Sequence, residues 1–194
     1  MEILNFDKNF SKTYHGEKIR YGVMFGGKKI AFIKSGAGSR IGGTKNKYLQ
    51  ISNILKAKGF SVICASNPIE SVNVDKTVIL NFVDEMGFSD YELYFFGASD
   101  GAYYNLDLAR AFPQSVKLVS VNSSNIGIDE FIEKLRLIPT IEKTLIYGTL
   151  DEDFKFTSRI ENAAIKSLKI ITIDNANHEF SGMTDKFISF AKLL

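Results

Sequence analysis

The chain has 194 residues, a length that favours one domain with a substantial hydrophobic core. Its hydrophobic fraction of 45%, charged fraction of 24% and net charge of +2 are ordinary for a globular protein, and the mixed charges exclude a densely basic nucleic-acid-binding surface. No apolar run is long enough to span a membrane, and residues 1–12 lack the apolar segment of a signal peptide.

The apolar runs predict strands that alternate with helices. Residues 1–28 are expected to be rich in strands, and a polar loop at 13–18 is expected to expose His15. Strands are expected at 19–25, 30–33, 60–65, 91–96, 116–121, 144–147 and 169–173, and helices at 48–58, 74–86, 102–110, 129–137, 157–166 and 184–194. Strands and helices in this order predict an α/β fold in which a mostly parallel central sheet has helices on both faces. The strand runs are continuously apolar, as expected for strands covered on both sides. We expect one domain over residues 1–194.

Cys64 is the only cysteine and lies inside the apolar run 60–65. A single cysteine forms no internal disulfide, so we expect a buried, unreactive thiol in a reducing compartment. With no signal peptide expected, this predicts a cytoplasmic protein.

A glycine-rich loop at 35–43 follows the expected strand 30–33. Glycines at positions 36, 38 and 42 are one residue off the Gly-x-Gly-x-x-Gly pattern of a dinucleotide-binding loop. The next strand, 60–65, is followed by Ser66-Asn67-Pro68 and not by the acidic residue that would bind a ribose. The sequence therefore argues against a dinucleotide cofactor.

The sequence Gly97-Ala98-Ser99-Asp100-Gly101 has the form Gly-x-Ser-x-Gly and lies between a buried strand and a helix. This is the context in which the motif forms a sharp turn that lifts the serine hydroxyl off the end of the sheet. The turn requires glycine at positions 97 and 101, because a Cβ at either position would collide with the neighbouring helix or strand.

Four loops at strand ends carry polar or glycine residues in the order glycine loop, serine, acid and histidine. Functional groups collect at the carboxyl ends of parallel strands. With the elbow at 97–101, the acidic segment 148–151 and the histidine loop 175–180, the chain resembles the α/β-hydrolase superfamily from about residue 19 to 194. The loop 35–38 corresponds to the family's His-Gly oxyanion segment, with Ser35 in place of the histidine.

The resemblance implies a catalytic triad. Ser99 would be the nucleophile and His178 the base that it needs. Asp151 would orient the imidazole, with Asp153 as the alternative and Glu152 as the weakest of the three carboxylates. The same acidic cluster is also typical of an ordinary solvated helix start.

The resemblance also implies an oxyanion hole made by the backbone N–H groups of Ala37 and Asp100. The Asp100 carboxylate would either repel anionic substrates or point to solvent.

The predicted function is that of a serine hydrolase that cleaves a small or exposed acyl ester in a small-molecule substrate, of the carboxylesterase or thioesterase type. No cofactor or metal is expected, since the sequence has no His-x-x-x-His motif and no cysteine pair. No nucleic acid partner is expected, and no oligomeric state is indicated.

The segment between the strands 116–121 and 144–147 holds one short helix, so we expect no cap domain over the site. Two alternatives remain: a binding or signalling module without turnover, and an acyltransferase with the same triad.

Overall fold

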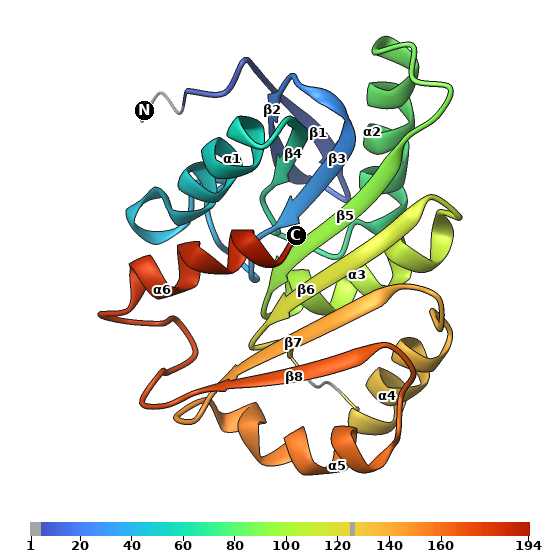
Figure 1. Ribbon diagram of the computed structural model, residues 1–194. Helices are drawn as coiled ribbons and strands as arrows, with labels where there is room; N and C mark the ends of the chain where they lie inside the picture. The colour runs from blue at the N-terminus through green and yellow to red at the C-terminus, as the bar shows by residue number, and fades with distance from the viewer. Residues whose placement is uncertain (1–4, 125–126) are drawn as a thin grey trace.

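The computed structural model describes residues 5–124 and 127–194, and an eight-stranded sheet forms its centre (Figure 1). The strand order is β1-β2-β4-β3-β5-β6-β7-β8. β1 pairs with β2 and β2 with β4 in antiparallel fashion, and every pair from β4 to β8 is parallel. The strands are β1 (Lys8–Tyr14), β2 (Glu17–Met24), β3 (Gly27–Lys34), β4 (Phe60–Ala65), β5 (Glu92–Ala98), β6 (Ser115–Val121), β7 (Glu142–Gly148) and β8 (Leu168–Ile173).

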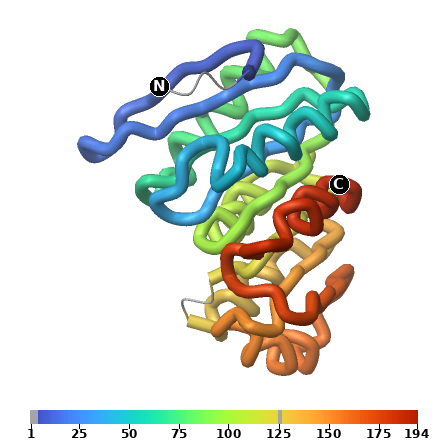
Figure 2. Tube along the Cα trace, turned by 90° about the vertical axis from the view of Figure 1, so that its left-hand side faces the viewer, coloured from blue at the N-terminus to red at the C-terminus, as the bar shows by residue number. Residues whose placement is uncertain are grey.

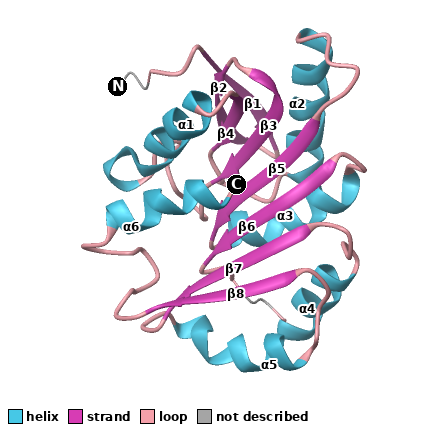
Figure 3. Cartoon of the chain, viewed as in Figure 1, coloured by secondary structure: helices cyan, strands magenta, loops and turns pink. Residues whose placement is uncertain are grey.

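Six α-helices are formed by the described residues, and they cover both faces of the sheet (Figure 3). They are α1 (Lys47–Ala57), α2 (Val72–Glu85), α3 (Asp100–Ala111), α4 (Ile128–Arg136), α5 (Thr157–Asn162) and α6 (Thr184–Ser189). Buried residues of α1 and α6 share one core cluster, and those of α2 to α5 share the other. The expected α/β architecture, a mostly parallel sheet between two helical layers, is therefore confirmed.

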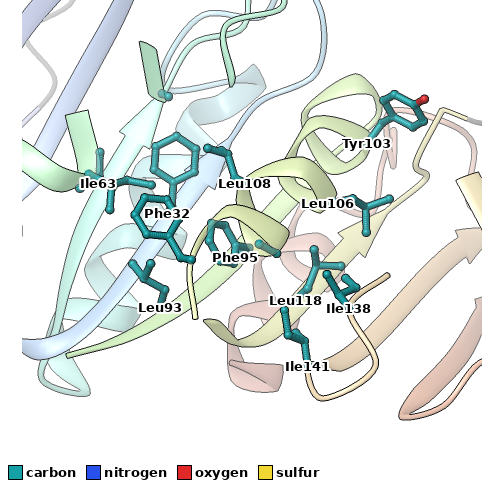
Figure 4. Packing of buried hydrophobic residues seen from close by; sticks show 14 of the residues in the cluster. Phe32, Ile63, Leu93, Phe95, Tyr103, Leu106, Leu108, Leu118, Ile138 and Ile141 are labelled. Atoms are coloured by element: carbon teal, nitrogen blue, oxygen red, sulfur yellow. The ribbon is translucent and has the colours of Figure 1, made fainter. Parts of the chain in front are cut away.

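The central strands contribute to both cores because successive side chains of a strand point to opposite faces. In β3, Phe32 packs on the side of α3 and Ile33 on the side of α1. Phe95 of β5 lies beside Phe32, with ring centroids 6.4 Å apart (Figure 4). This two-sided burial explains why the strand sequences are apolar throughout.

The amino-terminal hairpin of β1 and β2 lies at one end of the molecule (Figure 2). The expected loop at 13–18 is wrong, because β1 runs to Tyr14 and pairs with Glu17 at the start of β2. The turn consists of His15 and Gly16, with φ of 48° and 80°. Two positive φ values are the backbone of a tight two-residue hairpin turn. His15 is exposed there, as expected.

Two helices differ from the sequence prediction near the carboxyl terminus. The helix expected at 157–166 ends at Asn162, and Ala164 and Ser167 have positive φ values of 49° and 57°. These left-handed residues break the helical path and turn the chain into β8. The helix expected at 184–194 is α-helical only to Ser189 and continues as a 3₁₀ turn over Phe190–Leu193.

A buried ion pair joins β3 to α2, and no pattern in the sequence predicted it. Lys34 Nζ lies 2.6 Å from Asp75 Oδ2, and both side chains have no exposed surface. Asp75 also accepts hydrogen bonds from the hydroxyls of Tyr21 (2.6 Å) and Ser71 (3.1 Å). Buried charges persist only when they are paired and hydrogen-bonded, as these are. The network fixes the carboxyl end of β3, where the glycine-rich loop begins.

The described residues include no helix with both the length and the apolarity to cross a bilayer. Cys64 lies in β4 with no exposed surface, as expected, and its Sγ contacts the backbone oxygen of Ile41. Burial raises the pKa of this thiol, which favours its unreactive protonated form.

Candidate active site

Ser99 lies in a sharp turn between β5 and α3, at the edge of the sheet toward which β3 to β8 all run (Figure 1). Its φ of 52° and ψ of −131° are a conformation that residues other than glycine rarely adopt. A Cβ on Gly97 would lie 2.6 Å from the Cα of Ala102, and one on Gly101 would overlap the backbone of Ser35. The expected reason for both glycines is confirmed: one lets the helix approach the turn, and the other lets β3 approach the helix.

Backbone hydrogen bonds hold this turn on two sides. The N–H of Ser99 donates to the carbonyl oxygen of Val121 in β6 (3.0 Å), and the carbonyl oxygen of Ser99 accepts from the N–H of Ala102 in α3 (3.0 Å). The unusual backbone conformation is thus maintained by neighbouring elements, as strained residues at functional sites generally are.

His178 lies in the loop between β8 and α6, and its ring contacts two of the predicted residues. His178 Nε2 lies 3.0 Å from Ser99 Oγ, and His178 Nδ1 lies 2.5 Å from Asp151 Oδ2. When the ring is neutral and Nδ1 donates to the carboxylate, Nε2 is left as an acceptor for the Ser99 hydroxyl. The Asp151 side chain is fully buried, whereas that of His178 is 40% exposed.

Asp151 is the carboxylate that reaches the His178 ring. It lies three residues after the end of β7, and its second oxygen, Oδ1, accepts the backbone N–H of Asp153 (2.8 Å). The structure therefore gives Asp151 and Asp153 different positions: Asp151 contacts the imidazole, and Asp153 contacts Asp151 through its backbone. Glu152 begins the short 3₁₀ segment Glu152–Phe156.

The pKa of His178 is raised above its ordinary value of 6.5. The hydrogen bond to Asp151 is the main cause, the charge of Asp151 adds to it, and partial burial opposes it. The negative charges of Glu179 and Asp153 raise the pKa further. The site is thus arranged to stabilise an imidazolium ion, the form that the ring takes after it accepts a proton.

The glycine-rich loop after β3 lies against Ser99. A Cβ on Gly36 would be 3.1 Å from the Cβ of Ser99 and 3.8 Å from its Oγ. The N–H of Gly38 donates to the backbone oxygen of Asn67 (2.9 Å), and the N–H of Ser39 donates to the carbonyl oxygen of Gly36 (3.2 Å). These bonds hold the loop that contains Ala37.

The two predicted oxyanion donors are the backbone N–H groups of Ala37, in the glycine-rich loop, and of Asp100, the first residue of α3. Among the described residues, no acceptor is found for the N–H of Ala37 or for that of Asp100. The Asp100 side chain is partly exposed.

Within residues 5–124 and 127–194, no three His, Cys, Asp or Glu side chains are grouped as metal ligands would be. The chemistry available at the site is that of the chain's own groups: a hydroxyl, an imidazole paired with a carboxylate, and backbone N–H donors.

No model of a known protein family matches the sequence, and neither does any curated protein. Solved structures do match over nearly the whole chain. Est1E from Butyrivibrio proteoclasticus is 12% identical with a TM-score of 0.73, and the match covers 95% of this chain and 96% of Est1E. An alpha-beta serine hydrolase homologue from Coxiella burnetii is 17% identical with a TM-score of 0.71, and the match covers 98% of each chain.

The esterase domain of a Rhodothermus marinus protein is similar as well. It is 13% identical with a TM-score of 0.69, and the match covers 96% of this chain and 95% of that one. The TM-scores show a shared architecture. At identities this low the chemistry has to be argued from the residues of the site. The sheet order, the turn at Ser99 and these three structures agree on one conclusion: the chain has the α/β-hydrolase fold.

Proposed function

We propose that the protein is a serine hydrolase that cleaves small or exposed acyl esters, of the carboxylesterase or thioesterase type. The observation that carries this proposal is the continuous set of contacts from Asp151 through His178 to Ser99, with the serine on a strained turn. A serine hydroxyl is a weak nucleophile at neutral pH and needs a base within hydrogen-bond reach, which the 3.0 Å contact of Ser99 Oγ with His178 Nε2 supplies.

In the proposed reaction, Ser99 Oγ attacks the acyl carbonyl carbon while His178 Nε2 takes the hydroxyl proton. The carbonyl oxygen becomes an oxyanion, stabilised by the N–H groups of Ala37 and Asp100. His178 then returns the proton to the leaving group as the bond to it breaks, which leaves an acyl-enzyme. A water molecule, deprotonated by His178, attacks the acyl-enzyme and regenerates Ser99. Asp151 holds the ring in the productive tautomer and stabilises its charged form.

The similar structures support a hydrolase, because one of the three is described as a serine hydrolase homologue and another as an esterase domain. The likeness is one of fold, so the choice of an ester or thioester substrate rests on the site. The nucleophile and base of this site are the groups used for acyl transfer to water.

Substrate size follows from what covers the site. Between β6 and β7 the described residues form one helix, α4, which packs in the core cluster of α2, α3 and α5. A pocket gains affinity for a longer acyl chain by burying it, at about 0.8 kcal/mol per methylene. With one short helix in this segment, few apolar walls are present to enclose a long chain.

We therefore expect kcat/KM to be highest for acetyl and butyryl esters and not to rise through octanoyl and palmitoyl esters. Interfacial activation, which depends on the opening of a lid, should be absent. The measurement is kcat/KM for p-nitrophenyl esters of these four acids, below and above their solubility limits. A steady rise of kcat/KM up to the palmitoyl ester, or a jump in rate above the solubility limit, would contradict the expectation that the site has no lid and few apolar walls.

The raised pKa of His178 sets the expected pH dependence. A group with a raised pKa stays protonated to higher pH, and protonated His178 accepts no proton from Ser99. The rate should therefore rise with pH along a limb centred above 6.5 and fall as the pH drops through that value. A profile of kcat/KM against pH from 5 to 9 measures it, and a flat profile would contradict a histidine base.

The direct test of the proposed function is covalent labelling by a fluorophosphonate, combined with a panel of esters, thioesters and amides. Wild-type protein should be labelled at Ser99 and should hydrolyse esters or thioesters faster than amides. Product analysis with added alcohols or amines separates hydrolysis from acyl transfer. A folded wild-type protein that is neither labelled nor active on any of these substrates would overturn the proposal in favour of a binding module.

A further inference from the structure

Asn122 follows β6 directly and contacts the two segments that carry Asp151 and His178. Its Nδ2 donates to the backbone oxygens of Asn177 (3.2 Å) and His178 (2.9 Å), and its Oδ1 accepts the N–H of Gly148 (2.9 Å). The residue is 1% exposed. One side chain thus bonds to the histidine itself and to the last residue of β7, three positions before the acid.

The position suits asparagine for two separate reasons. The backbone at Asn122 has a φ of 44°, in the left-handed region where asparagine is found several times more often than most residues. The amide also combines two donors with an acceptor, which is the set that two carbonyl oxygens and one N–H require. An apolar side chain here would leave three backbone groups without these partners.

The strand β6 therefore holds each part of the site through two consecutive residues. The carbonyl oxygen of Val121 accepts the N–H of Ser99, and the Asn122 side chain bonds to His178 and to Gly148. The N–H of Asn122 in turn donates to the carbonyl oxygen of Ile146 in β7 (2.8 Å). The segments that carry the nucleophile, the base and the acid are thus all hydrogen-bonded to the carboxyl end of β6.

We infer that Asn122 is a positioning residue that keeps the His178 ring in register with both Ser99 and Asp151. The inference rests on the proposed hydrolase function for its kinetic consequence, though not for the geometry. A base displaced by about 1 Å costs on the order of 10²-fold in rate, because the reacting atoms leave the attack geometry. The effect should appear in kcat more than in KM, since Asn122 contacts the base loop and not the substrate.

The test compares two variants of Asn122 with one control. Asn122→Gly keeps the left-handed backbone without strain and removes all three side-chain bonds. Asn122→Asp keeps the shape and the acceptor for Gly148 but loses the donors to the histidine loop. The control is Lys143→Met at the other end of β7, where Lys143 Nζ likewise donates to two backbone oxygens, those of Ile138 (2.8 Å) and Ile141 (2.7 Å).

We expect both Asn122 variants to lower kcat about 10- to 100-fold with KM changed by less than about twofold, and Lys143→Met to leave kcat within about twofold of wild type. Wild-type kcat in Asn122→Gly would overturn the inference. An equal loss of kcat in Lys143→Met would also overturn it, because the effect would then be one of general stability. If the glycine variant does not fold, Asn122→Asp carries the same comparison.

A second readout does not depend on turnover. The chain has two histidines, so the ring signals of His178 are readily identified in an NMR titration. His178 faces the negative charges of Asp151, Glu179 and Asp153. In Asn122→Gly, which adds no charge beside the ring, the pKa of His178 should fall toward 6.5. An unchanged His178 titration would contradict the inference. If wild-type protein shows no Ser99-dependent labelling, the proposed function fails, and this titration still decides the role of Asn122.

Discussion

Replacing Ser99 with alanine should lower kcat about 10⁴-fold or more without unfolding the protein. The variant loses only the Oγ atom, which is the nucleophile of the acylation step in the proposed mechanism. The turn itself depends on Gly97, Gly101 and the backbone bonds of residue 99 to Val121 and Ala102, all of which remain. The measurement is kcat on p-nitrophenyl acetate for wild type and variant, with thermal unfolding of both followed by circular dichroism.

A matched control is Ser39→Ala, which removes a hydroxyl from the glycine-rich loop beside the site. No step of the proposed mechanism uses the Ser39 side chain, so we expect its kcat to stay within about twofold of wild type. Activity that survives in a clean preparation of Ser99→Ala would show that another residue is the nucleophile.

The layout of the sheet was predictable because most strands are buried on both faces and their sequences are therefore apolar runs. β4, Phe60–Ala65, was predicted with its observed bounds for this reason. β1 was not predicted as a separate strand, because most residues of this edge strand are exposed and Lys8 to Tyr14 lacks the continuous apolar run that marks the central strands. The early end of α5 depends on the backbone at Ala164 and Ser167, which alanine and serine do not signal.

Residues that carry a recognisable motif at a strand end could be located from sequence. Ser99, Asp151 and His178 are of this kind. In the structure the His178 ring lies 2.5 Å from the Asp151 carboxylate on one side and 3.0 Å from the Ser99 hydroxyl on the other. Residues that act through distant contacts could not. The partner of Lys34 is 41 positions away, and that of Asn122 is 56 positions away. An asparagine directly after a strand, at the edge where the site forms, was the one available signal for Asn122.

The acid of the proposed triad gives the second large expected effect. Asp151→Asn should lower kcat about 10³- to 10⁴-fold. An amide at position 151 can donate to Nδ1 of His178, which favours the tautomer with the proton on Nε2. That nitrogen then accepts no proton from Ser99, although every atom stays near its place. The hydrogen bond to Asp151 is the main cause of the raised pKa of His178, so the loss of the carboxylate should lower that pKa. The part of the pH profile in which the rate rises with pH should therefore move to lower pH.

Asp153→Asn is the matched control, since it makes the same chemical change two residues along the chain. The bond from position 153 to Asp151 is made by its backbone N–H and survives the substitution. We expect kcat to fall less than about threefold, with a small shift of the limb to lower pH because one negative charge near His178 is lost. Measuring kcat/KM against pH for both variants separates the two carboxylates. Equal losses, or a larger loss in Asp153→Asn, would mean that Asp151 is not the residue that orients the base during the reaction.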